Sequence, residues 1–102
     1  MLLAIDKQAI LYLFDSEEQV LNEFETIDVE NTEYEFCDET GRKLVAKITK
    51  PVTRFRGGSF RLIQVGNPDE NLPMSFINKA REIGRSCSGI SNLDDLKKLF
   101  QP

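Results

Sequence analysis

Two alternating stretches on either side of Gly41 constrain the fold of this chain more than any other feature. Residues 33–36 alternate polar and apolar side chains, and residues 43–48 do so with one exception. Such alternation is typical of half-buried strands, and a three-residue loop ending in Gly41 suits a hairpin, because glycine readily adopts the left-handed conformation. This loop pairs Phe36 with Leu44 on one face. A two-residue turn would shift the pairing by one residue and mix the faces, so we predict the first register.

The segment before the hairpin combines a strand with a helix. Residues 9–14 form a continuous apolar run, which is typical of a strand buried on both faces. Residues 2–5 form either a separate short strand or an extension of it. A helix should begin at Asp15 or Ser16, because both cap well and both precede a capping-box partner by three residues. The predicted apolar face of this helix comprises Val20, Leu21, Phe24 and Ile27.

The segment after the hairpin predicts one more strand and two more helices. Residues 54–58 should form a loop and residues 59–65 a strand. A helix should begin near Pro73, which the first helical turn tolerates, and end at Gly84. Ser91 should cap the last helix. The apolar stripe of that helix comprises Leu93, Leu96, Leu99 and Phe100.

These elements predict an α+β fold. Three strands follow one another without an intervening helix, which argues against a doubly wound parallel sheet. The chain has 102 residues, of which 40% are apolar, and this suffices for a core without metals or disulfides. We therefore predict one domain over residues 1–102, with a mostly antiparallel sheet of about four strands and two or three helices packed on one face.

Acidic and basic side chains are segregated along the chain. Residues 8–41 contain eleven acidic side chains and no Lys or Arg, whereas residues 42–68 contain seven basic side chains and no acid. Folding of the hairpin can neutralise part of this charge, for example by setting Glu33 opposite Lys47, and such a pair contributes about 0.2–1 kcal/mol. The acids outnumber the bases, however, so an acidic surplus remains.

The acidic surplus predicts a surface for a basic partner. Such a surface accelerates encounter with a basic protein and discourages wrong partners. The first helix and the loop after it carry most of the surplus. The candidate partner-binding residues on this acidic face are Glu17, Glu18, Glu23, Glu25, Asp28 and Glu30.

The basic segment over residues 42–61 offers an alternative surface. Its combination of arginine and phenylalanine suits phosphate contact and base stacking. Nucleic acid is nevertheless disfavoured as a partner, because the acidic block repels a polyanion and the isoelectric point near 4.8 is far from the usual basic footprint. Phe55 either packs on the core or anchors an interface between two arginines. The candidate residues on this alternative surface are Arg54, Phe55, Arg56 and Arg61.

Little catalytic or metal-binding chemistry is available to the chain. It contains no histidine, which excludes Ser–His and Cys–His catalysis and removes the commonest zinc ligand. Cys37 and Cys87 are 50 residues apart and match no metal spacing, so we expect two half-buried, inert thiols that stay reduced, with a disulfide as the alternative. No glycine-rich phosphate-binding motif is present. We therefore predict a protein that is not an enzyme and that has no metal and no cofactor.

Nothing in the sequence indicates a membrane-bound or exported protein. No apolar run approaches the roughly 20 residues needed to cross a bilayer, and the N-terminus lacks the basic region of a signal peptide. We expect a cytoplasmic, non-enzymatic protein-binding module that neutralises a basic partner. In size and charge it is analogous to bacterial toxin-immunity proteins, although no family motif is present. The alternatives are a nucleic-acid-associated or regulatory ligand-binding domain that uses the basic segment, and a structural subunit or a homodimer built on a sheet edge.

Overall fold

The computed structural model describes residues 1–31, 33–54, 57–86 and 89–100, which form six strands and four helices. The strands are β1 (Leu2–Asp6), β2 (Ile10–Phe14), β3 (Tyr34–Asp38), β4 (Lys43–Lys50), β5 (Ser59–Val65) and β6 (Glu82–Ser86). The helices are α1 (Glu17–Glu23), α2 (Thr26–Glu30), α3 (Leu72–Lys79) and α4 (Leu93–Phe100). The sheet order is β5-β4-β3-β1-β2-β6. β2 and β6 are parallel and all other neighbours antiparallel, so the α+β class is confirmed but the sheet is mixed and larger than predicted.

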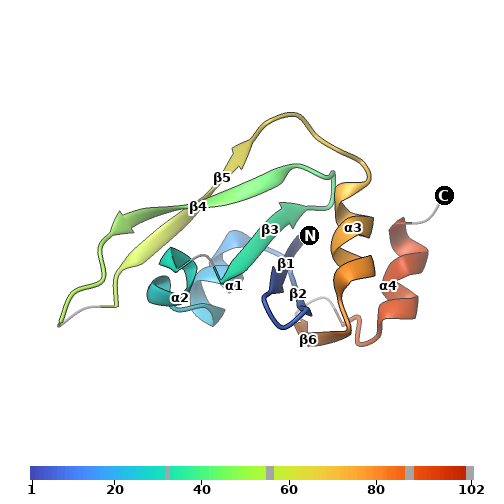
Figure 1. Ribbon diagram of the computed structural model, residues 1–102, viewed down its shortest axis with the longest axis horizontal. Coiled ribbons are helices and arrows are strands. Elements are labelled where there is room, and N and C mark those ends of the chain that lie inside the picture. The colour runs from blue at the N-terminus through green and yellow to red at the C-terminus, as the bar shows by residue number, and fades with distance from the viewer. Residues whose placement is uncertain (32, 55–56, 87–88, 101–102) are drawn as a thin grey trace.

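Helices cover both faces of the sheet, so the prediction of a single covered face is wrong (Figure 1). α3 and α4 bury side chains against one face, and α1 and α2 bury side chains against the other. The physical reason lies in the two central strands. β1 and β2 carry apolar side chains at almost every position, and a strand of that kind must be covered on both faces.

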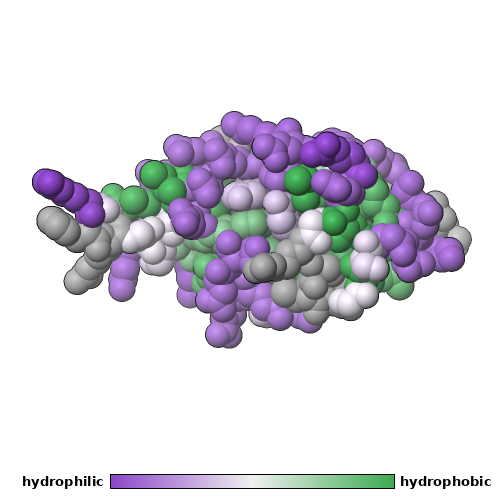
Figure 2. Space-filling view, turned by 90° about the horizontal axis from the view of Figure 1, so that it is seen from below, coloured by the Kyte–Doolittle hydropathy of each residue, from purple (hydrophilic) through white to green (hydrophobic). Residues whose placement is uncertain are grey.

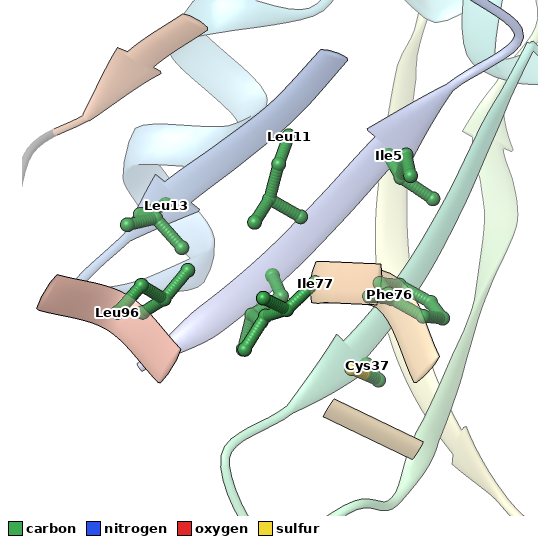
Figure 3. Packing of buried hydrophobic residues seen from close by; sticks show 8 residues of the cluster. Ile5, Leu11, Leu13, Cys37, Phe76, Ile77 and Leu96 are labelled. Carbon is green, nitrogen blue, oxygen red and sulfur yellow. The ribbon is translucent and has the colours of Figure 1, made fainter. Parts of the chain in front are cut away.

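The face under α3 and α4 holds a buried cluster that we name the aliphatic core (Figure 3). Most of its side chains are leucine or isoleucine from β1, β2, α3 and α4. Its buried members are Leu3, Ile5, Leu11, Leu13, Cys37, Phe76, Ile77 and Leu96. No buried side chain of β4 or β5 belongs to it, so among the described residues this core ends at β3.

The face under α1 and α2 holds a second cluster, the aromatic core, organised around Phe24. The Phe24 ring stacks on Tyr34 with 4.0 Å between centroids and meets the rings of Tyr12 and Phe14 edge-on at 5.1 and 5.5 Å. The buried members are Ala4, Phe14, Val20, Phe24, Val29, Phe36, Leu44 and Phe60. Unlike the aliphatic core, this cluster extends across β4 to β5.

The first predicted helix is divided in two at Phe24. Ser16 caps α1 as predicted, by accepting a hydrogen bond from the Gln19 N–H. The prediction of one apolar face reaching Ile27 is wrong, because Phe24 leaves the helical conformation and α2 begins after Glu25. The break lets Phe24 enter the aromatic core, whereas Ile27 is left 46% exposed.

The hairpin register agrees with the prediction. β3 and β4 pair antiparallel with Phe36 opposite Leu44. Gly41 adopts the left-handed conformation in the connecting turn, at φ 88°. A Cβ at Gly41 would overlap the backbone carbonyl of Asp69, so glycine also allows the turn to lie against the connector that leads to α3.

The C-terminal third differs from the prediction at three points. α3 ends at Lys79 rather than at Gly84, because the chain enters β6 and adds to the sheet beside β2. Gly84 is therefore a strand residue, and a Cβ there would lie 2.7 Å from the Ile10 Cγ2 atom. The predicted cap at Ser91 is also wrong. Asn92 takes that role, since its Oδ1 accepts a hydrogen bond of 2.9 Å from the Asp95 N–H.

The β4–β5 hairpin gives the molecule its elongated shape. The principal extents are 46 × 28 × 21 Å, and the far end of this hairpin projects beyond the helices (Figure 1). We name the paired part of β4 and β5 the ribbon. The predicted strand over residues 59–65 is thus confirmed as half of the ribbon.

Candidate functional site

Glu17, the first of the predicted acidic residues, makes contacts within the chain. Its Oε1 lies 3.0 Å from Arg61 Nε, and its Oε2 accepts a hydrogen bond of 3.3 Å from the Leu62 N–H. Leu62 lies on β5, the outermost strand of the sheet. Glu17 therefore connects α1 to the β5 edge of the sheet and accepts a hydrogen bond from a backbone N–H group of that edge.

The other five predicted acidic residues lie on α1, on α2 or at the N-cap of α2. Glu18, Glu25 and Glu30 are exposed and Asp28 is half-buried. None of these four carboxylates forms an ion pair or a side-chain hydrogen bond within the described part of the chain. Ile27, which lies between Glu25 and Asp28 in the sequence, is exposed as well. We name this set the acidic surface: Glu18, Glu25, Ile27, Asp28 and Glu30. Hydrophilic side chains cover much of this side of the molecule (Figure 2).

The fold keeps the basic strand residues away from the acidic surface. Along β4, Leu44 packs in the aromatic core on the side of α1 and α2, so Lys43 and Lys47 point to the opposite side of the sheet. The predicted ion pair between Glu33 and Lys47 is absent from the described residues. Instead, Glu17 of the acidic block contacts Arg61 of the basic block around the edge of the sheet.

The outer side of the ribbon carries exposed apolar side chains between lysines. Val45, Ile63 and Val65 are 44%, 43% and 39% exposed. Val45 is directly opposite Ile63, and Lys43 is directly opposite Val65. The helices α3 and α4, which cover this side of the central strands, bury none of these side chains. We name this set the ribbon surface: Lys43, Val45, Lys47, Ile63 and Val65. This surface could not be predicted from the sequence, because alternation reveals two faces of a strand without showing which one is covered.

The two described residues of the predicted basic surface, Arg54 and Arg61, have different surroundings. Arg61 contacts Glu17, whereas Arg54 lies near the tip of the β4–β5 hairpin. Arg54 lines an open groove of about 730 Å³. The opposite wall of this groove includes Glu23 and Glu25, so a predicted acidic and a predicted basic residue share it. Phe55 and Arg56 lie outside the described residues, and the two hypotheses for Phe55 remain predictions.

A polar group that the sequence analysis missed organises the turn between β1 and β2. Asp6 accepts hydrogen bonds from the N–H groups of Gln8 and Ile10 through Oδ1 and from the Tyr12 hydroxyl through Oδ2, at 2.9 to 3.0 Å. Burial, assisted by Asp6, raises the pKa of Tyr12 to about 12. Ala9 adopts φ 64° in the same turn. Both carboxylate oxygens of Asp6 thus help to hold the turn, which is a structural role.

The described residues provide no arrangement suited to metal binding, since no three His, Cys, Asp or Glu side chains gather in them. Cys37 is a free, fully buried thiol, and burial, assisted by Asp38, raises its pKa to about 12. A thiol with such a pKa is a poor nucleophile at neutral pH. The other cysteine, Cys87, lies outside the described residues.

Comparison with known proteins provides no family assignment. No family model, no curated protein and no solved structure matches the chain. None of the described helices combines the length and apolar character needed to cross a membrane. Conclusions about function therefore depend on the two surfaces of the molecule.

Proposed function

We propose that this protein is a non-catalytic binding module whose acidic surface binds and neutralises a basic segment of a partner protein. The observation that carries the proposal is that the sheet separates the acidic surface from the lysines of β4. Glu18, Glu25, Asp28 and Glu30 form no ion pair within the described chain, and Lys43 of the basic block points to the other side.

Besides its negative charge, the acidic surface contains an exposed apolar side chain, as protein interfaces do. Ile27 is 46% exposed and lies between Glu25 and Asp28 in the sequence, one helical turn before Glu30. An apolar side chain inside a charged rim is the usual plan of an interface, since the rim excludes water from the central contact. Lysine and arginine of a partner would pair with the rim, and an apolar partner residue would cover Ile27.

The electrostatic arrangement favours fast association with a basic protein. Exposed charges of one sign on one face steer an oppositely charged partner and raise the association rate, by an amount that falls as salt is added. A partner of this kind should have an isoelectric point well above neutrality. The proposal includes a cytoplasmic location, where this protein would neutralise its partner.

The experiment is an affinity capture from native-host cells with the tagged protein, followed by identification of the captured chain. The test variant is Glu25→Lys/Glu30→Lys. We expect it to reduce capture at least about tenfold, and we expect about 0.5 M salt to reduce capture by the wild-type protein similarly, because screening shortens the range of the charges.

The matched control is Glu70→Lys/Asp94→Lys, which changes the net charge equally at exposed sites elsewhere. Asp94 lies in the first turn of α4 and Glu25 at the start of α2, so both variants lose a favourable charge at a helix N-terminus. Three results would contradict the proposal. They are capture of nucleic acid, capture that does not change with salt, and an equal loss of capture in the two variants.

A further inference from the structure

The acidic surface and the ribbon surface lie on opposite sides of the sheet. α1 and α2 lie on the side to which Leu44 and Phe60 point, and the alternate residues Val45 and Ile63 point to the other. In Figure 1, α1 and α2 lie beneath the ribbon, and none of the described helices lies above it. Glu25 and Ile27 of the acidic surface line the groove that Arg54 also lines, and the ribbon surface lies on the other side of the strands.

The two surfaces are complementary in chemistry. The acidic surface sets Ile27 among carboxylates, and the ribbon surface sets Val45 and Ile63 between Lys43 and Lys47. Stacking one copy on another would bring lysines to carboxylates and β-branched side chains to an isoleucine. Each contact would remove exposed apolar area from water and pair charges that have no ion pair within the described chain.

We propose that a second copy of this chain occupies the ribbon surface with its acidic surface, so that the protein associates head to tail. The inference uses the acidic surface of the proposed function but does not require the foreign partner. A contact between two different surfaces is heterologous and leaves one free surface of each kind at the ends. Association can therefore continue beyond a dimer.

Symmetric contacts are disfavoured by the same observations. A two-fold contact between ribbon surfaces would place Lys43 and Lys47 near the lysines of the partner copy, and a two-fold contact between acidic surfaces would place carboxylates together. Strand addition at β5 is opposed as well, because Glu17 already binds the Leu62 N–H at that edge.

The experiment is sedimentation velocity of the full chain at increasing protein concentration in low salt. We expect species larger than a dimer, and we expect about 0.5 M salt to weaken the association about tenfold or more. Two blocked variants then test the geometry. The ribbon-blocked variant is Lys43→Gln/Val45→Ser/Lys47→Gln, and the helix-blocked variant is Glu25→Gln/Ile27→Ser/Glu30→Gln. Circular dichroism shows whether each variant is folded.

Head-to-tail association makes an unusual prediction for these variants. Each should be monomeric alone, and an equimolar mixture should form a heterodimer that does not grow, because each variant keeps only one functional surface. A blocked variant that still dimerises alone indicates a symmetric contact and overturns the proposal, as does a wild-type protein that stays monomeric.

The same variants separate this inference from the proposed function. The ribbon-blocked variant should lose self-association and keep the capture of a basic partner, whereas the helix-blocked variant should lose both. If the wild-type protein self-associates but captures no basic partner, the proposed function fails and the self-association stands.

Discussion

The two faces of the sheet are covered to different extents, and the ribbon shows the consequence. On one face, α1 and α2 contact β5 and β4, so the aromatic core extends to Leu44 and Phe60. On the other face, α3 contacts β1 and β3, and the aliphatic core ends at Cys37. The ribbon is thus buried on one side and exposed on the other. Where a covering helix is missing, an alternating strand presents its second set of side chains to solvent, and here that set combines lysine with valine and isoleucine.

The largest expected effect comes from the aromatic core, which covers one face of the sheet. Phe24→Ala removes the ring at its centre, and we expect a loss of about 3–5 kcal/mol in the free energy of unfolding, because a large cavity opens among the neighbouring rings. Urea denaturation followed by circular dichroism measures it. A loss below about 1.5 kcal/mol would mean that the aromatic rings do not hold α1 and α2 on the sheet.

A pair of neighbouring substitutions on β4 tests the one-sided burial of the ribbon. Leu44→Thr should cost about 2–5 kcal/mol, since it leaves a cavity and a hydroxyl in the aromatic core. Val45→Thr keeps the shape and the β-branching of an exposed side chain and should stay within about 0.5 kcal/mol of wild type. Thermal and urea unfolding of both variants give the difference. Equal losses would show that the outer side of the ribbon is buried as well.

Gly41 joins the two regions, because its turn lies against the connector that leads to α3. Gly41→Ala should cost about 1–3 kcal/mol through backbone strain and through overlap with the Asp69 carbonyl. Gly66→Ala is the matched control, since Gly66 also has a positive φ, at 71°, but has open space around it. If both variants lose the same stability in urea denaturation, the conformation of the turn alone matters and the contact with Asp69 contributes nothing.

The smallest expected effect is a pH dependence from Asp38 in the same turn. Burial alone would raise the pKa of Asp38, but hydrogen bonds from Thr40 and Arg42 outweigh it and hold the pKa below the usual value of 3.8. The ionised carboxylate therefore contributes stability above that pH, and the contribution is lost as the pH falls through the folded-state pKa.

Asp38→Asn removes this titration. Urea denaturation from neutral to acidic pH should show a stability difference between wild type and Asp38→Asn that is largest near neutrality and shrinks below about pH 4. A difference that stays constant across this range would show that the turn does not depend on the charge of Asp38.

Features with a local cause could be predicted from the sequence. The register of Phe36 with Leu44 follows from alternation and from the left-handed turn at Gly41, both of which depend on a few neighbouring residues. The cap at Ser16 follows from its position before an amphipathic segment. The charge blocks and the absence of histidine are also properties of the sequence alone, and they direct the search toward binding surfaces.

Features with a distant cause could not be predicted. Glycine is common at helix ends, so local preference predicts a helix end at Gly84. Instead β6 forms as a parallel neighbour of β2, and that pairing depends on residues some 70 positions apart. The spacing of Phe24 predicts a continuous helix, and the stack on Tyr34 overrides that local preference.

The candidate surfaces show the same division between local and distant causes. By itself, the sequence determined that β4 has two chemically different faces and that acidic side chains gather around α1 and α2. Only the tertiary structure decided that these helices pack on the Leu44 face, so that Lys43 and Val45 are exposed on the other. The choice of face depends on how the chain crosses the sheet after β2, where packing of Val20 and Phe24 against distant strands fixes the path of α1 and α2.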